Sequence, residues 1–504
     1  MTVFDIPKDP IRALRPSREE FRRLAFPGAV IPVAREVLAD RLTPLSAYER
    51  LASPNGSFLL ESVEGGERMA RYSYVGADPE CVIRTRGSIV TRIEATNVVE
   101  NRISDDRSPL DALQDQLAKY EWVDLPGLPR FAGGAVGYIA YDAVRGFERL
   151  PDTGVNDLDM DDYAFMVTRT LLAFDHVRHR LHIICTAVVA DEPDRAFDEA
   201  VERIDSVVQR LNGPHIPQPC TQGLSMPFIH TNQSRAEYEE AVETCRDYIM
   251  AGDAFQIVPS VRFSADIGCT PLELYRALRS INPSPYMYYL DLGSEQVVGS
   301  SPEILATVEN GTVTVRPIAG TRPRGANNEE DAVLAEDLLA DEKERAEHIM
   351  LVDLGRNDLG RVSAYGSVAS ERLMTIEKYS HVMHMVSTVT GRLAPQRTAF
   401  DAVQACFPAG TLTGAPKVRA MQIIDELEPT RRGLYGGAVG YFSFKGNADF
   451  AIAIRTMYIK NGRVYMQAGA GVVADSVPSR EYDECVNKAR ALIHAVALAH
   501  SGLE

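Results

Sequence analysis

Three arginines stand within ten residues of a chain that is otherwise strongly acidic. The stretch RPIAGTRPRG occupies positions 316–325, and the formal net charge of the 504 residues is −17. Between the arginines lies the small run Ala319-Gly320-Thr321, in which position 319 carries only a methyl group. An anionic ligand of so acidic a protein has to be met by a local cationic site. This stretch is one candidate.

A second candidate anion ligand is Arg455, within AIAIRTMY. In a strand spanning 448–460 its face would also carry Ala451 and Ala453, which leaves room for a carboxylate held by both guanidinium nitrogens. A structural ion pair with an aspartate would explain the arginine equally well. The following Gly469-Ala470-Gly471 lets backbone N–H groups approach a ligand oxygen, although tight turns use the same residues.

Carboxylates on two helical segments could hold a hard cation. Glu347 stands at the start of an apolar run in a helix expected over about 329–354, where an unpaired carboxylate is unfavourable. Glu484 shares a face with Glu481 and Lys488 in a helix beginning near 478, although such a face is often only a solvated salt-bridging surface. Brought together, Glu347 and Glu484 would suit Mg²⁺.

Three further side chains could take part in proton transfer or bind an anion. Glu303, in VVGSSPEIL, could be a general acid if burial raised its pKa. His384 lies three residues after His381, and one of the two could equally be a core histidine. Thr411 lies in PAGTLTGAPKVRA, a loop of glycine and proline that leads into a helix start, where anion contacts are common.

Composition bounds the class of protein. Hydrophobic residues make up 45% and charged residues 24% of the chain, as in soluble globular proteins. The acidity argues against nucleic acid or an anionic membrane as the main partner. The first 20 residues contain no apolar core and the chain contains no apolar run of about 18 residues, so we expect neither a signal peptide nor a membrane span, and seven scattered cysteines suit a reducing compartment. We therefore expect a cytoplasmic protein without a zinc site or disulfide framework.

A segment rich in Pro, Gly and Gln at 212–234 separates two helical patterns. It predicts an N-terminal domain over 25–211, a linker over 212–234 and a second domain over 235–500. The run GGAVGY occurs at 133–138 and again at 436–441, and Arg-Thr follows each copy later in the chain. Strands and long helices mix without regular alternation. The pattern predicts a doubled α+β architecture of antiparallel sheets with helices outside.

Eight blocks of the second half carry a family resemblance. They are GSSPE, PIAGTRPRG, AEHIMLVDLGRNDLGRV, HVMHMVS, AGTLTGAPKVRA, YGGAVGYF, AIAIRT and QAGAGVVADSVPSREYDECVNKA. Together they resemble the chorismate-binding enzymes, and within these the anthranilate synthase component I branch, from about residue 30 onward. The resemblance implies two packed antiparallel β-sheets, a β-sandwich, flanked by helices. It also implies Mg²⁺-dependent conversion of chorismate and ammonia to anthranilate and pyruvate, the first step of tryptophan biosynthesis.

The resemblance assigns roles to individual residues. The positions that match chorismate contacts are Gly320, Thr321, Tyr435, Arg455, Gly469, Ala470 and Gly471. Glu347 and Glu484 match the Mg²⁺ ligands, with Glu481 nearby. Glu303 matches the general acid, and His384 and Thr411 match residues near the departing hydroxyl, without dividing the acid and base roles between Glu303 and His384.

Two positions, Gln256 and Ala319, indicate which nucleophile adds to the ring of the substrate. The water-adding branches of the family resemble one another in having a lysine base where this chain has Gln256, and the aminodeoxychorismate branch usually has PIKGT where this chain has Ala319. Without either lysine, the nucleophile is external ammonia. No glutaminase motif is present, which implies a separate glutamine amidotransferase subunit. Aminodeoxyisochorismate or aminodeoxychorismate synthase remains the alternative, and a catalytically idle tryptophan-binding regulator is disfavoured.

The N-terminal half carries a resemblance to the tryptophan feedback site of the family. It rests on LLES at 59–62 and on NPSPYMYYL at 282–290. The matching residues are Ser62, Pro285, Tyr286 and Met287, with Glu61 and Arg71 as weaker candidates. LLES could also be an ordinary strand, here expected in a hairpin about Gly65-Gly66. Both blocks together favour an inhibitor site that could shift a two-state domain arrangement.

Overall fold

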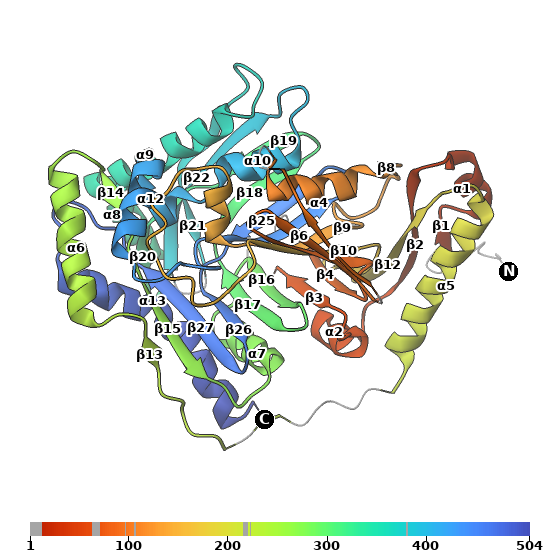
Figure 1. The fold of residues 1–504 in the computed structure, drawn as a ribbon, viewed down its shortest axis with the longest axis horizontal. Helices are drawn as coiled ribbons and strands as arrows, with labels where there is room; N and C mark the ends of the chain where they lie inside the picture. The colour runs from red at the N-terminus through yellow and green to blue at the C-terminus, as the bar shows by residue number, and fades with distance from the viewer. Residues whose placement is uncertain are drawn as a thin grey trace.

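Two large β-sheets packed face to face form the centre of the molecule in a computed structural model (Figure 1). The structure describes residues 13–62, 71–95, 97–104, 107–214, 220–221, 223–379 and 382–503. Helices cover the outer face of each sheet, which gives four layers. The predicted α+β class with two packed antiparallel sheets is confirmed, and among the described pairs of neighbouring strands only β2 and β8 run parallel.

The first sheet has 13 strands in the described part of the chain, and the second has 12. The first runs β1 (Leu14–Arg15), β2 (Ala29–Leu38), β12 (Arg180–Val188), β11 (Thr170–Asp175), β4 (Tyr72–Ala77), β3 (Ser57–Glu61), β16 (Tyr286–Asp291), β17 (Glu295–Ser301), β26 (Thr456–Lys460), β27 (Arg463–Gly469), β15 (Ser260–Asp266) and β13 (His230–Thr231), with β8 (Glu121–Trp122) beside β2. The second runs β20 (Ile318–Pro323), β22 (Val382–Arg392), β19 (Thr312–Val315), β18 (Ile304–Glu309), β25 (Ala448–Ile452), β24 (Ala438–Ser443), β9 (Gly134–Ile139), β10 (Tyr163–Thr168), β5 (Cys81–Arg86), β6 (Ile89–Glu94) and β7 (Asn97–Arg102), with β21 (Ala369–Lys378) beside β22. A separate ribbon pairs β14 (Gln256–Ile257) with β23 (Gly414–Ala415).

The helices divide between the two outer faces. Outside the first sheet lie α1 (Arg18–Leu24), α2 (Pro44–Leu51), α5 (Pro193–Asn212), α6 (Arg235–Met250), α7 (Pro271–Ile281) and α13 (Pro478–Ser501). Associated with the second are η2 (Tyr141–Gly146), α4 (Pro109–Ala118), α8 (Asn328–Ala340), α9 (Glu342–Gly360), α10 (Ala399–Cys406) and α11 (Gly410–Thr413), while α12 (Lys417–Leu427) contacts both outer cores.

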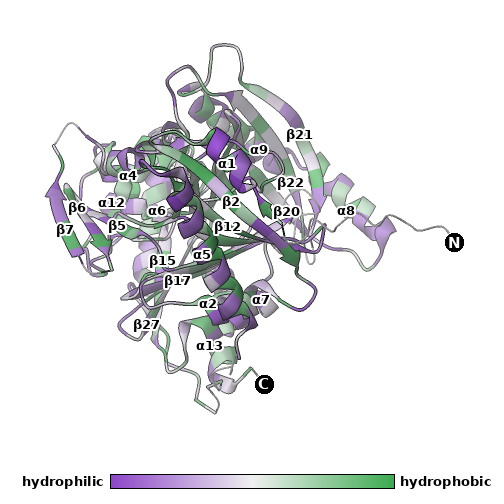
Figure 2. Cartoon of the chain, turned by 90° about the vertical axis from the view of Figure 1, so that its right-hand side faces the viewer, coloured by the Kyte–Doolittle hydropathy of each residue, from purple (hydrophilic) through white to green (hydrophobic). Residues whose placement is uncertain are grey.

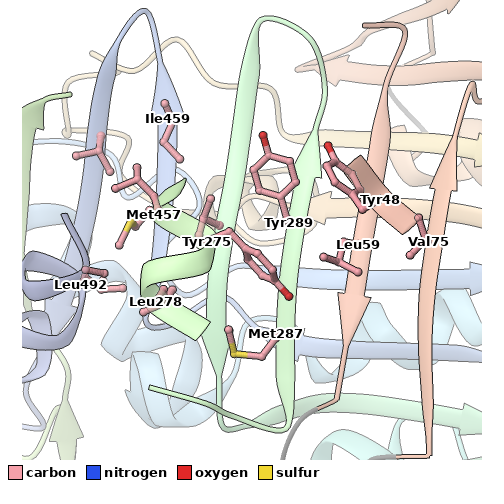
Figure 3. Close-up of a cluster of buried hydrophobic side chains, with 14 of the residues drawn as sticks. Tyr48, Leu59, Val75, Tyr275, Leu278, Met287, Tyr289, Met457, Ile459 and Leu492 are labelled. Carbon is pink, nitrogen blue, oxygen red and sulfur yellow. The ribbon is translucent and has the colours of Figure 1, made fainter. Parts of the chain in front are cut away.

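Strand alternation divides the apolar side chains among three cores. In β3, Phe58 points between the two sheets and Leu59 points outward, under the helices. Figure 3 shows this outer core, where Leu59, Tyr289 and Met457 from neighbouring strands meet Tyr275 of α7 and residues of α13. None of the helices in the described part of the chain has the length and apolar character needed to cross a membrane.

The repeated GGAVGY runs lie side by side at the centre of the second sheet. β9 and β24 pair antiparallel with Gly137 directly opposite Gly440, so each copy meets the same motif position of the other. A Cβ at either glycine would overlap a carbonyl oxygen of the adjacent strand, at Ala164 or Asp449. Strand order continues symmetrically outward from this pair, as a doubled architecture requires. The expected division at 212–234 falls between α5 and α6, and both sheets contain strands from both sides of it.

Two expected elements were wrong. The expected strand over 448–460 is β25 and β26, which belong to different sheets, and the chain turns between them with Arg455 at φ 49°. The alternation argument that placed Arg455 beside Ala451 and Ala453 therefore does not hold. The expected helix over 329–354 is α8 and α9, separated at Asp341, whose side chain accepts from the first N–H groups of α9.

Two sequence expectations lie outside the described residues, namely the hairpin tip at Gly65-Gly66 and His381. All seven cysteines lie among the described residues, and six of them are buried.

Candidate active site

Glu303 lies where the chain passes from β17 in one sheet to β18 in the other. Thr411, on the short α11, donates its hydroxyl hydrogen to Glu303 Oε1 at 3.1 Å. Burial raises the pKa of Glu303 to about 7, against the hydrogen bond from Thr411 and the charges of Lys488 and Arg455. A carboxyl group with such a pKa is protonated to a large extent at neutral pH and can donate a proton.

Arg455 occupies the corresponding crossing between β25 and β26. Its carbonyl oxygen accepts from Ser300 N–H at 3.1 Å, which fixes the turn beside the end of β17. Burial lowers the pKa of Arg455, and the charge of Glu303 opposes that shift. Within the described residues no carboxylate forms an ion pair with this guanidinium. A buried arginine without a carboxylate partner is suited to bind one from a ligand.

Tyr435 and the predicted glycine loop come together at the end of β27. A Cβ at Gly469 would lie 2.9 Å from Tyr435 Oη, so the hydroxyl rests against this backbone. Ala470 N–H donates to the carbonyl oxygen of Pro259 at 3.2 Å, and Lys488 Nζ donates to the Gly469 carbonyl oxygen at 2.9 Å. Because the N–H of Ala470 already donates this hydrogen bond within the protein, it is not available to a ligand.

Gly320, Thr321 and His384 form a second group, on β20 and β22. Gly320 has φ 64° at a bulge of β20, and this left-handed conformation directs its carbonyl oxygen to within 3.2 Å of His384 Nδ1. Thr321 Oγ1 lies 3.0 Å from the same nitrogen. Because a carbonyl oxygen only accepts, Nδ1 carries the hydrogen. Burial lowers the pKa of His384, so the neutral ring has only an acceptor at Nε2.

Two of the three arginines of RPIAGTRPRG, Arg322 and Arg324, pair with aspartates of α8 and of the junction between α8 and α9. Arg322 pairs with Asp337 at 2.8 Å and with Asp341 at 2.9 Å, and Arg324 pairs with Asp331 at 2.6 Å. These contacts tie β20 to α8 and to the start of α9. Arg322 and Arg324 therefore anchor the loop, whereas Gly320 and Thr321 face His384.

The side-chain amide of Gln256 donates a hydrogen bond to the carboxylate of Glu347. Gln256 Nε2 donates to Glu347 Oε1 at 3.2 Å, and a Cβ at Gly471 would lie 2.7 Å from the same nitrogen. Glu344, one turn earlier on α9, has its pKa raised by burial and by the charge of Glu347. The structure thus places the carboxylates of Glu344 and Glu347 close together on α9, and Gln256 lies between Glu347 and Gly471 of the glycine loop.

Glu484 lies on α13 and pairs with Lys488 at 2.8 Å. Burial raises the pKa of Glu481, and the charge of Glu484 adds to this shift. No group of three or more His, Cys, Asp or Glu side chains within the described ranges is arranged to hold a metal. Glu347 and Glu484 are oxygen donors of the kind that Mg²⁺ takes, with water and substrate oxygens completing its shell.

Sequence reasoning gave no site role to Lys488 or Glu344. Lys488 contacts both Gly469 and Glu484, and its charge acts on Glu303. Its signal in the sequence was the four-residue spacing from Glu484, which also fits an exposed salt bridge. By contrast His348 is a core residue, with Nε2 2.6 Å from Ser387 Oγ.

The predicted inhibitor residues meet at the junction of the two halves. β3 and β16 pair antiparallel with Met287 opposite Glu61. Ser62, which follows Glu61, therefore lies at the same end of this strand pair as Tyr286 and Pro285, which precede Met287. Tyr286 Oη donates to Asp449 Oδ1 at 2.9 Å, and Met287 is buried in the outer core beside Tyr275 (Figure 3). These are positions only, and a ligand role for them stays a prediction.

The weaker inhibitor candidates are engaged within the protein. Glu61 pairs with Arg279 at 2.9 Å and accepts from Tyr275 Oη at 2.5 Å. Arg71 pairs with Asp175 at 2.8 Å.

Comparison with known proteins places these residues in a family. The family model described as chorismate binding enzyme matches residues 55–494. Anthranilate synthase component 1 of Pseudomonas putida is 49% identical over 96% of this chain and 99% of its own length. That of Mycobacterium tuberculosis (strain H37Rv) is 50% identical, covering 96% of each.

Solved structures with a similar fold include members of the same family. Anthranilate synthase component I from Streptococcus pneumoniae superposes with a TM-score of 0.76 at 39% identity, over 91% of this chain and 99% of the other. MenF, the menaquinone-specific isochorismate synthase of Escherichia coli, superposes with a TM-score of 0.68 at 18% identity, over 95% of this chain and 98% of the other. The second likeness concerns the fold alone.

Proposed function

The chain belongs to the family of chorismate-binding enzymes, and from that premise we propose that it is the large subunit of an anthranilate synthase. It would convert chorismate and ammonia to anthranilate, pyruvate and water, as the first committed step toward tryptophan. The observation that carries the proposal is the combination of a protonated Glu303 with an Arg455 that has no carboxylate partner in the described chain. One supplies a proton and the other binds an anion.

Chorismate carries two carboxylates, and the site offers two kinds of partner. Arg455 would bind one carboxylate, with Tyr435 and the backbone of Gly469 and Gly471 beside it. Glu347 and Glu484 would hold Mg²⁺, which when bound supplies positive charge for the other carboxylate. Gly320 and Thr321 line the same site and orient His384.

Glu303 would deliver its proton to the ring hydroxyl, which leaves as water. Thr411 holds the carboxyl group in place through Oε1. His384 has no hydrogen at Nε2 in its neutral form and so would accept a hydrogen bond there. Ammonia adds to the ring as the hydroxyl leaves, and loss of pyruvate with a ring proton then yields the aromatic product.

The nucleophile has to come from outside the chain. Ala319 presents a methyl group, and Gln256 is an amide bound to Glu347, so neither can attack the ring or act as a base. A separate glutamine amidotransferase subunit in the cytoplasm would supply the ammonia. The purified chain should then form fluorescent anthranilate from chorismate, Mg²⁺ and ammonium but not from glutamine. Glutamine-dependent turnover by the chain alone would contradict this assignment.

Tryptophan would act as feedback inhibitor at the junction of β3 and β16. Ser62, Pro285, Tyr286 and Met287 surround that junction, and the strands there belong to different halves of the chain. A ligand that prefers one arrangement of the halves would shift the population of the active one. Ser62→Arg should abolish inhibition while ammonium-dependent activity stays. Equal sensitivity of variant and wild type would remove the proposal.

A further inference from the structure

One arginine is buried almost completely between segments that carry the candidate site. Arg432 lies on the connection from α12 to β24, and only 1% of its side chain is exposed. Its Nε and Nη2 donate to the carboxylate of Glu428 at distances from 2.7 to 3.2 Å. That carboxylate also accepts from the backbone N–H and the hydroxyl of Ser260. The charge of Arg432 is therefore neutralised within the protein.

Arg432 also holds the short helix α11 through its backbone. Its Nη1 donates to the carbonyl oxygen of Leu412 at 2.7 Å. Leu412 directly follows Thr411, whose hydroxyl donates to Glu303 Oε1. α11 spans only four residues, too few for the repeating hydrogen bonds that stabilise a longer helix. The position of Thr411 against Glu303 therefore depends on contacts from outside the helix, of which this is one.

A second carbonyl contact reaches the segment that bears Gln256. Nη2 of Arg432 donates to the carbonyl oxygen of Val258 at 2.6 Å, directly after β14. β14 is a strand of two residues, and the side chain of Gln256 on it donates to Glu347. One planar guanidinium thus ties two short segments to the same buried carboxylate.

The ring of Tyr435 completes the contacts of Arg432 with the candidate site. The guanidinium carbon lies 5.4 Å from the centre of this ring and 4.7 Å from the centre of the Tyr141 ring. Both distances fall within the range of a cation–π attraction. Because the hydroxyl of Tyr435 rests against the backbone of Gly469, the same arginine also restricts where Tyr435 lies in the site.

We propose that Arg432 is a positioning residue of the active site, an inference that rests on the proposed function. A buried ion pair adds little stability beyond what apolar side chains of the same size would give, because both charges lose their hydration. What Arg432 provides is a planar fork of donors with a fixed direction. Thr411, Gln256 and Tyr435 lie on three separate segments, and this fork holds all three segments in one arrangement.

Arg432→Lys tests the proposal, because lysine keeps a positive charge beside Glu428 but lacks the planar fork. With ammonium as the nitrogen source, kcat/KM for chorismate should fall about 10- to 100-fold, as expected when reacting groups move by about 1 Å or less. Tyr141→Leu is a milder variant that leaves every hydrogen bond of Arg432 in place and should fold even where Arg432→Lys does not. Its kcat/KM should fall about threefold, because one of the two rings beside the guanidinium is lost.

The dependence of activity on pH separates positioning from a loss of folded protein. Fewer folded molecules lower kcat/KM equally at every pH. The hydrogen bond from Thr411 and the charges of Lys488 and Arg455 lower the pKa of Glu303, against burial, which raises it. When α11 is displaced, that hydrogen bond is lost and the pKa rises further. The alkaline limb of kcat/KM should therefore move to higher pH in Arg432→Lys, by about half a unit or more.

Arg84→Lys is the matched control. Arg84 has 13% of its side chain exposed, and it donates to Asp161 and Glu295 at 2.7 Å and to the carbonyl oxygen of Leu292 at 2.8 Å. It lies on β5, near the edge of the second sheet opposite to β20, as Figure 2 shows. The urea midpoint of unfolding should fall in this variant as in Arg432→Lys. Its kcat/KM should stay within about twofold of wild type, and its alkaline limb should not move.

An alkaline limb that stays in place in both Arg432→Lys and Tyr141→Leu would overturn the proposal. Equal losses of kcat/KM in Arg432→Lys and Arg84→Lys would also overturn it, because they would assign Arg432 to the stability of the fold alone.

Amide hydrogen exchange gives a measurement that needs no turnover. Peptides covering 410–416 and 256–258 should exchange about tenfold faster in Arg432→Lys than in wild type, and at the wild-type rate in Arg84→Lys. Unchanged exchange in Arg432→Lys would contradict the proposal. If wild type formed no anthranilate from ammonium, the proposed function would fail, while the exchange rates would still decide whether Arg432 holds these two segments.

Discussion

The two halves of the chain place a glutamate and an arginine at equivalent crossings between the sheets, and they use them differently. In the C-terminal half these are Glu303, before β18, and Arg455, between β25 and β26. In the N-terminal half Glu80 precedes β5 in the same way, and Arg169 lies between β10 and β11. Glu80 and Arg169 form an ion pair at 3.0 Å. Glu303 and Arg455 do not pair.

The two halves also differ in the segment that follows α10 in one half and α4 in the other. After α10 the chain forms α11, and Thr411 reaches Glu303. After α4, the equivalent helix, it passes to the edge strand β8 instead. The N-terminal pair neutralises its own charge and stabilises the fold. In the proposed active site, the C-terminal pair would keep a proton and a positive charge available for a ligand, so that only one half of the repeated scaffold would carry the site.

The largest contrast is expected for the two glutamates. Glu303→Gln removes the proton donor, so anthranilate formation should fall about 1,000-fold, within the range for a lost general acid. Glu80→Gln removes half of a structural ion pair and should leave turnover within about twofold. Product fluorescence under saturating chorismate, Mg²⁺ and ammonium measures both. Comparable losses in the two variants would mean that the halves do not differ in this way.

The arginines should give effects of opposite sign on stability. Arg455→Met removes a buried charge without a carboxylate partner, so kcat/KM for chorismate should fall about 100-fold while the free energy of unfolding rises by about 1 kcal/mol. Arg169→Met leaves Glu80 partly buried and unpaired, which should lower the free energy of unfolding by about 1–3 kcal/mol with little change in kcat/KM. Urea unfolding and steady-state kinetics check the two pairs of values.

These residues show which parts of the fold and of the candidate site could be predicted from the sequence. The repeated GGAVGY and the irregular mixture of strands and long helices are visible in the sequence, and the layered fold was predicted from them. The turn at Arg455 was missed because AIAIRTMY has the alternation of one continuous strand, whereas tertiary packing sends its two ends into different sheets. Glu303 and Arg455 were proposed as site residues, but the pairing of Glu80 with Arg169 depends on contacts about 90 residues apart that no local pattern encodes.

The raised pKa of Glu303 predicts how activity and stability should depend on pH. With a pKa of about 7 in the folded state, the protonated fraction of Glu303 falls about tenfold for each pH unit above about 8. The value of kcat/KM, calculated with the concentration of unprotonated ammonia, should fall in the same proportion. The folded state holds this proton more tightly than the unfolded state, whose pKa is near 4.5. Stability should therefore decrease as pH rises from about 4.5 to 7, by at most about 3 kcal/mol. Glu303→Gln should remove that part of the pH dependence, and an unchanged profile would contradict it.

The smallest effect concerns the caps of the equivalent helices α4 and α10. Ser108 and Thr398 each accept from the N–H of the aspartate three residues on, and that aspartate accepts in return. Ser108→Ala and Thr398→Ala should each lower the free energy of unfolding by about 1 kcal/mol, because both remove one cap. Only Thr398→Ala should also lower kcat, by a few-fold, since α10 leads directly to Thr411. Equal kcat in the two variants, measured beside their unfolding curves, would show that the cap of α10 does not help to position Thr411.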